Sequence, residues 1–452
     1  MQEKPESKPK AKSKKSSVRH TRAIQRDRSK RPNTAPSDAT IEERLEELVH
    51  PATLHQVAHF HSLGLRARTL NLPVMMAFVL SLIWRQLGSV TEAVRTLNRE
   101  GLLWVDERKV SQQAVEQRLG SLPAVLFERV LQEVLPLMAA RWHERKRPLP
   151  PALSWAKSHF SAVVALDGST LDALLRKTGL LRDGQGPVLA GRMAALVDII
   201  SRLPRQVWYE QDQHAHDQRF WERALGSLQR GMLVVFDLGF LNFNRFDQLC
   251  EAGVWFLTRK EERVVTHTEQ VLRRTATLHD QIVRLGSKAT SQCAHPIRLV
   301  SWLHQGKWYH YLTNVLDPEV LPAEYVVALY WQRWRIEDSF NVIKRLLGLA
   351  YFWTGSLNGI QIQVWATWIL YAVLVDLTDA VAEALNRPFH ALSMEMLYRG
   401  LYHFTIARQR GKADDLIAYL AAEAVGLGIL KREPKNPTAV TNLLYLTIPQ
   451  PP

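Results

Sequence analysis

The sequence has few of the features that build secreted, zinc-binding or membrane-spanning proteins. Its two cysteines, Cys250 and Cys293, are too few for a zinc site or a disulfide framework, which favours a reducing compartment. No apolar run follows the basic N-terminal segment, so no secretory signal is expected. The longest apolar segments, residues 72–84 and 364–375, are shorter than the roughly 20 residues that a bilayer span needs. We therefore expect buried core helices there and no membrane partner.

Acidic residues are outnumbered, with 44 Asp and Glu against 58 Lys and Arg, and the formal net charge is +14. Most of this excess lies in residues 1–36, where twelve basic and three acidic residues give +9. The segment is rich in Lys, Ser and Pro and cannot bury enough surface to fold alone. We predict a disordered basic tail over residues 1–37 that adds salt-dependent affinity for nucleic acid. A purely solubilising tail is the alternative.

Residues 325–350 predict the helix on which the functional argument depends. On an ideal helix, one narrow face carries a phenol, two cations and a carboxylate, from Tyr330, Arg333, Glu337 and Lys344. A second stripe has the spacing of a buried face and consists of Leu329, Ile336, Phe340, Ile343 and Leu347. The polar row would suit a polyanion bound beside a metal ion. A solvated charged face is the alternative.

The spacing Y-x2-R-x3-E-x6-K resembles the signature of the insertion-sequence DDE transposases, in the family named after insertion sequence four. The resemblance implies that Glu337 is the third catalytic carboxylate. It also implies that Tyr330, Arg333 and Lys344 contact phosphates at the transposon end. It requires two aspartates upstream, each at the end of a buried strand.

Two segments meet that requirement. Residues 161–170 predict an apolar strand ending at Asp167, and residues 232–240 predict another ending at Asp237. The other elements expected here are strands at 193–200, 206–210 and 254–258 and helices at 217–230 and 242–252. Three strands, helix, strand, helix, strand is the order of the ribonuclease H fold. In the resembled family a basic residue often follows the second aspartate, whereas Leu238 stands here, which weakens one expected DNA contact.

We predict an α/β protein whose ribonuclease H-like core is split by a β-rich insertion, with an all-α N-terminal domain and a helical C-terminal region. The expected boundaries are 1–37 for the tail, 38–148 for the helical DNA-binding domain, 149–259 for the first part of the core, 260–318 for the insertion, 319–356 for the core helix and 357–452 for the C-terminal region. A hairpin turning at residues 305–307 is expected within the insertion.

The helical domain contains a short Ser-capped helix with a polar face, formed by Gln112, Gln113, Gln117 and Arg118. These amides and the guanidinium could contact base edges in a major groove. An ordinary helical bundle with a polar surface explains the pattern equally well.

Three converging carboxylates, from Asp167, Asp237 and Glu337, repel one another unless a cation neutralises them. Mg²⁺ is the expected cation, and Mn²⁺ can substitute, because the donors are oxygens and no thiolate cluster is present. Two such ions would activate water or a 3′-hydroxyl and stabilise the leaving oxygen in a displacement at phosphorus. Tyr330 is then not required as a nucleophile.

Family members that cut through a DNA hairpin hold an extruded base against an aromatic residue of the insertion. Trp302 and Trp308 are the candidates here, since stacking a base on an aromatic ring contributes about 1 to 3 kcal/mol. The hydrophobic face of a β-hairpin is an equally good interpretation of both.

The sequence therefore predicts a DNA transposase that cleaves transposon ends and joins them to a target. The resemblance implies double-stranded DNA as the partner, both terminal inverted repeats and target DNA. It also implies a homodimer on paired ends and a bacterial cytoplasmic protein associated with the nucleoid. A metal-dependent nuclease on the same core, or a decayed copy that only binds DNA, are the alternatives.

Overall fold

The computed structural model describes residues 41–172, 174–175, 189–212, 217–287, 292–349, 351–432 and 439–448. The predicted basic tail, residues 1–37, lies outside these ranges. The helices before the sheet are α2 Glu42–His55, α3 Val57–Ser62, α4 Leu72–Trp84, α5 Val90–Arg99, α6 Gln112–Ser121, α7 Val125–Glu144 and α8 Pro151–His159. The later helices are α9 Trp221–Ser227, α10 Phe243–Glu251, α11 Ala323–Gln332, α12 Trp334–Asn341, α13 Leu357–Ala384, α14 Met394–Gln409, α15 Leu416–Ala422 and α16 Ala439–Tyr445.

A mixed nine-stranded sheet forms the centre of the protein, in the order β4-β3-β1-β5-β6-β10-β9-β8-β7. Its strands are β1 Ala162–Asp172, β3 Leu189–Asp198, β4 Pro204–Glu210, β5 Met232–Phe236, β6 Trp255–Arg259, β7 Thr266–Arg274, β8 Leu278–Leu285, β9 Ile297–His304 and β10 Lys307–Thr313. β3 runs antiparallel to both β1 and β4, whereas β5 runs parallel to both β1 and β6. The predicted succession of strands and helices from residue 161 to residue 258 is therefore present.

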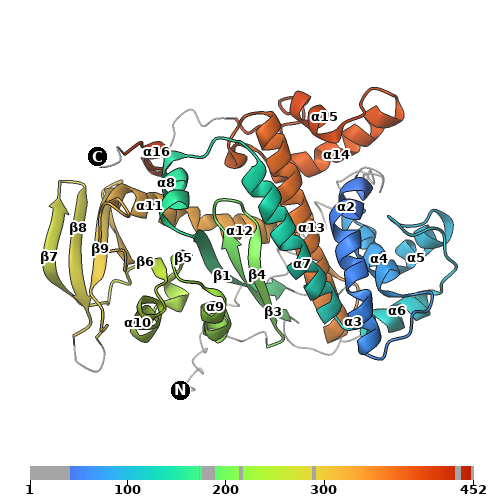
Figure 1. The fold of residues 1–452 in the computed structure, drawn as a ribbon, viewed down its shortest axis with the longest axis horizontal. Helices are drawn as coiled ribbons and strands as arrows, with labels where there is room; N and C mark the ends of the chain where they lie inside the picture. Colours follow the sequence, from blue (N-terminus) through green and yellow to red (C-terminus); the bar gives the residue numbers. More distant parts are fainter. Residues whose placement is uncertain are drawn as a thin grey trace, which may run out of the picture.

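Residues 260–318, predicted as a separate β-rich insertion, extend this same sheet. The expected hairpin forms between β9 and β10, and Gln305 and Gly306 at its turn have positive φ values of 50° and 75°. β10 also pairs antiparallel with β6, with Tyr311 opposite Arg259. Without β10, the backbone N–H and C=O groups on one edge of β6 would lack hydrogen-bond partners. β10 supplies these partners. Figure 1 shows the insertion strands continuing the sheet at its left side.

Side chains of the central strands alternate between two hydrophobic layers. Val163 and Ala165 face the larger core, which contains residues of α7, α11 and α13. Val164 and Leu166 face the opposite core, which contains residues of α9 and α10. Because successive side chains of a strand point to opposite faces, continuous apolar runs are needed where both faces are covered. This explains why β1 and β5 have no polar alternation.

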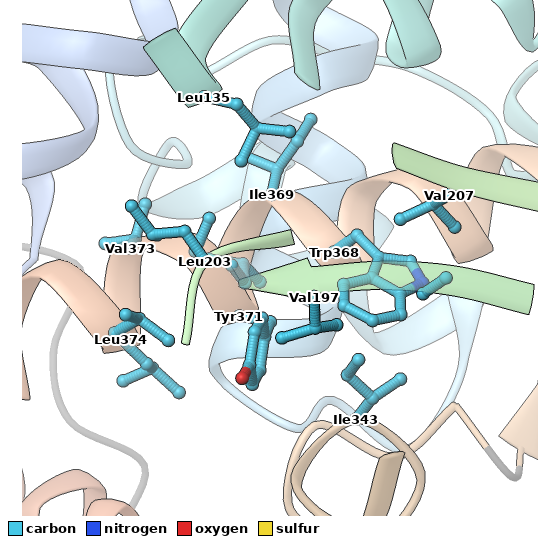
Figure 2. Packing of buried hydrophobic residues seen from close by; sticks show 14 of the residues in the cluster. Leu135, Val197, Leu203, Val207, Ile343, Trp368, Ile369, Tyr371, Val373 and Leu374 are labelled. Carbon is cyan, nitrogen blue, oxygen red and sulfur yellow. The ribbon is translucent and has the colours of Figure 1, made fainter. Parts of the chain in front are cut away.

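Helix α13 is buried over most of its length and lies beside α7 (Figure 1). Figure 2 shows Trp368 and Tyr371 of α13 packed near Val197 of β3 and Ile343. Among the described residues α13 alone is long and apolar enough to cross a membrane, but 89% of its most apolar window is buried inside the protein. The prediction of core helices over residues 72–84 and 364–375 is confirmed by the burial of α4 and α13.

The segment between α7 and α8 is fixed to α13 by buried ion pairs. Arg145 donates to Asp376 at 2.7 Å and to Asp379 at 3.1 Å, and Arg147 also pairs with Asp379. Burial raises the pKa of Asp379 to about 6 despite these cations. The segment therefore holds the N-terminal helices against the core and is not a loose connection.

The first helices of the described chain, α2 to α6, lie close together, as the blue to teal ribbons of Figure 1 show. Ser111 caps α6 as expected, with its Oγ accepting from the backbone N–H of Ala114 at 3.2 Å. Gln113 and Gln117 are exposed on this helix. Arg118 instead turns toward the protein body, where its Nε donates to the Leu70 carbonyl at 2.9 Å. Contact of the exposed amides with DNA bases stays a prediction, whereas the guanidinium of Arg118 is already engaged.

Candidate active site

The helix predicted over residues 325–350 is not one regular α-helix, and that expectation is wrong. α11 ends at Gln332, α12 begins at Trp334, and residues Val342–Leu346 form a π-helical turn. The Leu347 N–H donates to the Val342 carbonyl, five residues earlier. A π turn inserts an extra residue into the helical repeat and rotates the side chains within it. The predicted apolar stripe is nevertheless buried throughout.

Three acidic side chains come from the three elements that the sequence predicts. Asp167 lies on β1, and Asp237 directly follows the parallel neighbour β5. Their strands are in register, with Leu166 opposite Phe236, so the two aspartates are at the same edge of the sheet. Glu337 lies in the first turn of α12, which packs against β1. Asp237 also caps the short helix that follows it, accepting from the Gly239 N–H at 2.8 Å.

Arg333 lies between two of these acids. Its Nη1 donates to Asp167 Oδ2 at 3.0 Å and its Nη2 to Glu337 Oε1 at 3.3 Å. The Arg333 side chain is only 7% exposed, whereas that of Glu337 is 38% exposed. Sequence reasoning placed this guanidinium on DNA and missed its role as an internal counter-ion. The i, i+4 spacing of Arg333 and Glu337 is the signal in the sequence from which this pair could have been predicted.

Electrostatics show that the acids share one environment. Burial and the negative charge of Asp237 raise the pKa of Asp167 to about 7, although Arg333 acts in the opposite direction. Burial also raises the pKa of Glu337, again opposed by Arg333. One guanidinium therefore compensates these carboxylates only in part, and additional positive charge would stabilise their ionised forms.

The donor chemistry of this cluster fits a hard divalent cation, because every candidate ligand is a carboxylate oxygen. In the positions described here, however, no group of three Asp, Glu, His or Cys side chains is arranged to hold a metal ion. Arg333 lies in the space that separates Asp167 from Glu337. A metal shared by these acids therefore requires the guanidinium to turn away.

The other two members of the predicted polar row lie near the acids. Tyr330 is 5% exposed, with its ring 5.1 Å from that of Tyr311, and its pKa is raised by burial. Lys344, in the π turn, donates to Ser169 Oγ at 2.5 Å and to the Thr170 carbonyl at 2.6 Å. The structure thus brings Tyr330 and Lys344 to β1 and its neighbours. Their contacts with DNA phosphates stay predictions.

Arg259, which the sequence reasoning missed, lies at the end of β6 beside this site. Its positive charge lowers the pKa of both Tyr311 and Tyr330, against the larger effect of burial. Its Nε is buried and has no hydrogen-bond partner among the described residues. The available signal was its place at the end of the strand that runs parallel to β5.

The two tryptophans of the insertion lie in different environments. Trp302 is 9% exposed and stacks on His304 at 4.8 Å, so its ring already belongs to a packed face. Trp308 is half-buried, with its ring 4.5 Å from that of His279. In this structure Trp302 belongs to the hydrophobic face of the β-hairpin, which is the alternative interpretation given above. Base stacking stays a prediction for both, and Trp308 is the more accessible of the two.

The raised pKa of Asp167 gives a pH-dependent stability in the absence of metal. The folded protein holds a proton at Asp167 up to about pH 7, whereas the unfolded chain loses it near the ordinary value of 3.8. The contribution of Asp167 to the free energy of unfolding is therefore fully present below about pH 4. It decreases as the pH rises from 4 and is lost once the pH passes 7. We expect the wild-type free energy of unfolding in EDTA to fall relative to that of Asp167→Asn, by up to about 1.4 kcal/mol per pH unit. Urea denaturation measures both proteins across this range, and parallel pH profiles would contradict the expectation.

These features define a mixed α/β protein with a carboxylate cluster at the ends of two parallel strands and on a helix packed against them. A comparison with known protein families assigns a class of enzyme to this part of the chain. Residues 160–373 match the family described as "Transposase DDE domain". The match spans β1, β5 and α12, and so includes all three acids of the cluster. It confirms the predicted DDE transposase class for this part of the chain.

Two relatives are bacterial transposases by name. The chain is 28% identical over 169 residues to the putative transposase y4zB of Sinorhizobium fredii, a segment covering 36% of this chain and 45% of the relative. It is 22% identical over 176 residues to the probable transposase for insertion sequence element IS5377 of Geobacillus stearothermophilus, covering 38% and 45%. The chain thus spans less than half the length of either relative.

A solved structure, the cryo-EM structure of the piggyBac transposase synaptic complex with hairpin DNA, aligns over 88% of this chain and 85% of its own. Its sequence identity is 12% and its TM-score is 0.38.

Proposed function

We propose that this protein is the DNA transposase of a bacterial insertion sequence, which cleaves the element's ends and joins them to a target. The observation that carries the proposal is the convergence of Asp167 and Glu337 on Arg333, beside Asp237, within the segment that matches a DDE domain. The order of β4, β3, β1, β5 and β6 supports a ribonuclease H-like core. The Y-x2-R-x3-E-x6-K spacing supports the narrower assignment to the family named after insertion sequence four.

Asp167, Asp237 and Glu337 would hold Mg²⁺, or Mn²⁺ in its place, through carboxylate oxygens. A bound divalent ion supplies activation of a water or 3′-hydroxyl and stabilisation of the leaving oxygen. The high pKa of Asp167 means that binding a cation there releases a proton near neutral pH. We therefore expect that adding Mg²⁺ to the protein in weakly buffered solution near pH 7 releases protons and lowers the measured pH.

Arg333 has two roles in this proposal. Without a cation it neutralises Asp167 and Glu337, and with the acids occupied it is free to turn toward a DNA phosphate. Tyr330 and Lys344 would bind neighbouring phosphates of the same strand, with Arg259 as a further cation at the same edge of the sheet. Each of these groups positions DNA, and none of them forms a covalent bond to it.

The partners follow from the same proposal. Double-stranded DNA is the substrate, as terminal inverted repeats and as target, and two copies of the protein would bind paired ends. The basic segment at residues 1–36 would add affinity for any duplex. Such a protein would work in the bacterial cytoplasm on the nucleoid.

The test is a joining assay with a pre-cut element end bearing a free 3′-hydroxyl, its sequence taken from the DNA that borders the gene. With Mg²⁺ and a target plasmid, we expect a covalently joined product. The matched control is the same end with a 3′-dideoxy nucleotide, which should give none. Cleavage without joining would identify a nuclease instead. Binding without either reaction would identify a protein that only binds DNA.

A further inference from the structure

Three basic side chains and one histidine lie close enough together to act on one another electrostatically. They come from four separate segments and are Arg202, Arg335, His390 and Lys431. We call these the basic cluster. Arg202 follows β3 in the turn to β4, and Arg335 lies on α12 two residues before Glu337, which places it on a different side of that helix. His390 lies in a short helical turn, and Lys431 follows the strand-like bridge between Leu392 and Leu430.

Hydrogen bonds hold these segments together. Ser339 Oγ donates to the Arg335 carbonyl at 3.0 Å and lies 2.6 Å from the Tyr371 hydroxyl. The Tyr371 hydroxyl in turn donates to the Arg202 carbonyl at 3.0 Å. On the other side, Lys431 Nζ donates to the His390 carbonyl at 3.1 Å. The Arg202 guanidinium lies 5.7 Å from the ring of Phe389, next to His390. The basic cluster is therefore a fixed arrangement.

The central charge of the cluster, on Arg202, forms no ion pair with the residues that the structure describes. Arg202 is only 8% exposed, and its side chain makes no hydrogen bond or ion pair within the described part of the chain. Among the described residues, Asp338 is the one carboxylate that acts on Arg202 and on Lys431, and it is itself exposed and paired with Arg335. A buried guanidinium without an anionic partner is unfavourable unless a ligand supplies one.

The local potential is accordingly positive. Burial and the charges of Arg335, Arg202 and Lys431 lower the pKa of His390 to about 4. Burial and Arg335 lower the pKa of Arg202 to about 9. Both shifts come chiefly from burial, with the neighbouring positive charges acting in the same direction, and an anion bound among these groups would oppose them.

We propose that the basic cluster binds a phosphoryl oxyanion, with Arg202 at the base of the site and Arg335, His390 and Lys431 around it. A planar guanidinium binds two phosphate oxygens at once, and a lysine ammonium adds a point charge at the rim. The oxyanion is either a DNA backbone phosphate or free phosphate. The proposal does not depend on the proposed function, because a phosphate site formed by these residues can exist whether or not the protein joins DNA.

The first experiment measures thermal unfolding of the full chain in sodium phosphate and in sodium chloride of equal ionic strength. We expect phosphate to raise the Tm of the wild type and to raise the pKa of the His390 imidazole in an NMR titration. Lys431→Gln should weaken the apparent phosphate affinity about tenfold or more, since it removes one charge-assisted contact. Arg95→Gln, which alters an exposed arginine paired with Glu92, is the matched control and should respond like the wild type.

A second variant separates ligand binding from packing. Arg202→Met keeps the length of the side chain and removes its unpaired charge, so we expect an unchanged or higher Tm in chloride and no response to phosphate. If Arg202→Met or Lys431→Gln keeps the wild-type response, or if the wild type shows none, the proposal is overturned. Competition then identifies the source of the oxyanion. Loss of the phosphate response when duplex DNA is bound assigns the site to the DNA backbone, and a retained response assigns it to free phosphate.

Discussion

Glu337→Ala is expected to abolish DNA cleavage while leaving DNA binding intact. Glu337 is one of three acids available to a divalent cation, and its side chain is the more exposed of the two that Arg333 bridges. Losing one carboxylate ligand removes several kcal/mol of charge stabilisation in the transition state, which corresponds to a rate lower by roughly 10³-fold or more. Cleavage of a labelled element end with Mg²⁺ and a gel-shift assay on the same DNA measure the two properties.

The matched control is Asp338→Ala, which changes the next residue along α12. Asp338 is exposed and pairs with Arg335 instead of Arg333, so cleavage should stay within a few-fold of the wild type. Persistent cleavage in Glu337→Ala would show that Glu337 is not a metal ligand. Loss of DNA binding together with cleavage would instead point to a structural role for the pair with Arg333.

Asp280→Ala should strongly destabilise the half of the sheet formed by the insertion. Asp280 accepts two hydrogen bonds from Arg298, at 2.8 and 2.7 Å, and both side chains are almost completely buried. Removing one partner of a buried ion pair leaves an uncompensated charge and costs about 3 to 5 kcal/mol. Chemical denaturation followed by tryptophan fluorescence would show this loss, because Trp302 and Trp308 lie on the neighbouring hairpin.

The comparison for this variant is Glu269→Ala, which breaks a surface pair with Arg284 on the adjoining strands. Both partners are about 40% exposed, at 40% for Arg284 and 39% for Glu269, so the expected cost is about 1 kcal/mol or less. Equal losses in the two variants would contradict the buried role of Asp280. Arg298 also donates to the Leu321 carbonyl at 2.7 Å, just before α11. Asp280→Ala is therefore also expected to loosen the segment that leads into the helix carrying Tyr330.

Much of the core could be predicted from sequence because its signals are local. The apolar runs that end at Asp167 and Asp237 are set by strands covered on both faces, and each is visible in ten residues. The helix expected over residues 242–252 is present as α10 and is capped by Asn242, whose Oδ1 accepts from the Asn244 N–H at 2.9 Å. The partnership of these strands with Glu337 could be predicted only through the resemblance, since the residues are far apart in the sequence.

Other features depend on long-range contacts that no local pattern encodes. The pairing of β10 with β6 is one of these, because any strand with a free edge could have paired there. The π turn at Val342–Leu346 is another, since it accommodates both the buried stripe and the bond from Lys344 to β1. The resemblance places Arg333 on a DNA phosphate, and its position in the sequence gives no sign of burial. Its burial between Asp167 and Glu337 appears only once β1 and α12 are packed together.

The junction of β6 with β10 determines how the insertion can move during a reaction. Only three residue pairs join the two strands, with Tyr311, Leu312 and Thr313 opposite Arg259, Thr258 and Leu257. Within the sheet, this seam is the connection between the four outer strands and the other five. A substrate that moved the insertion as a unit would strain these three pairs. Backbone amide exchange at Leu312 would then report on substrate engagement more directly than exchange at the hairpin tip.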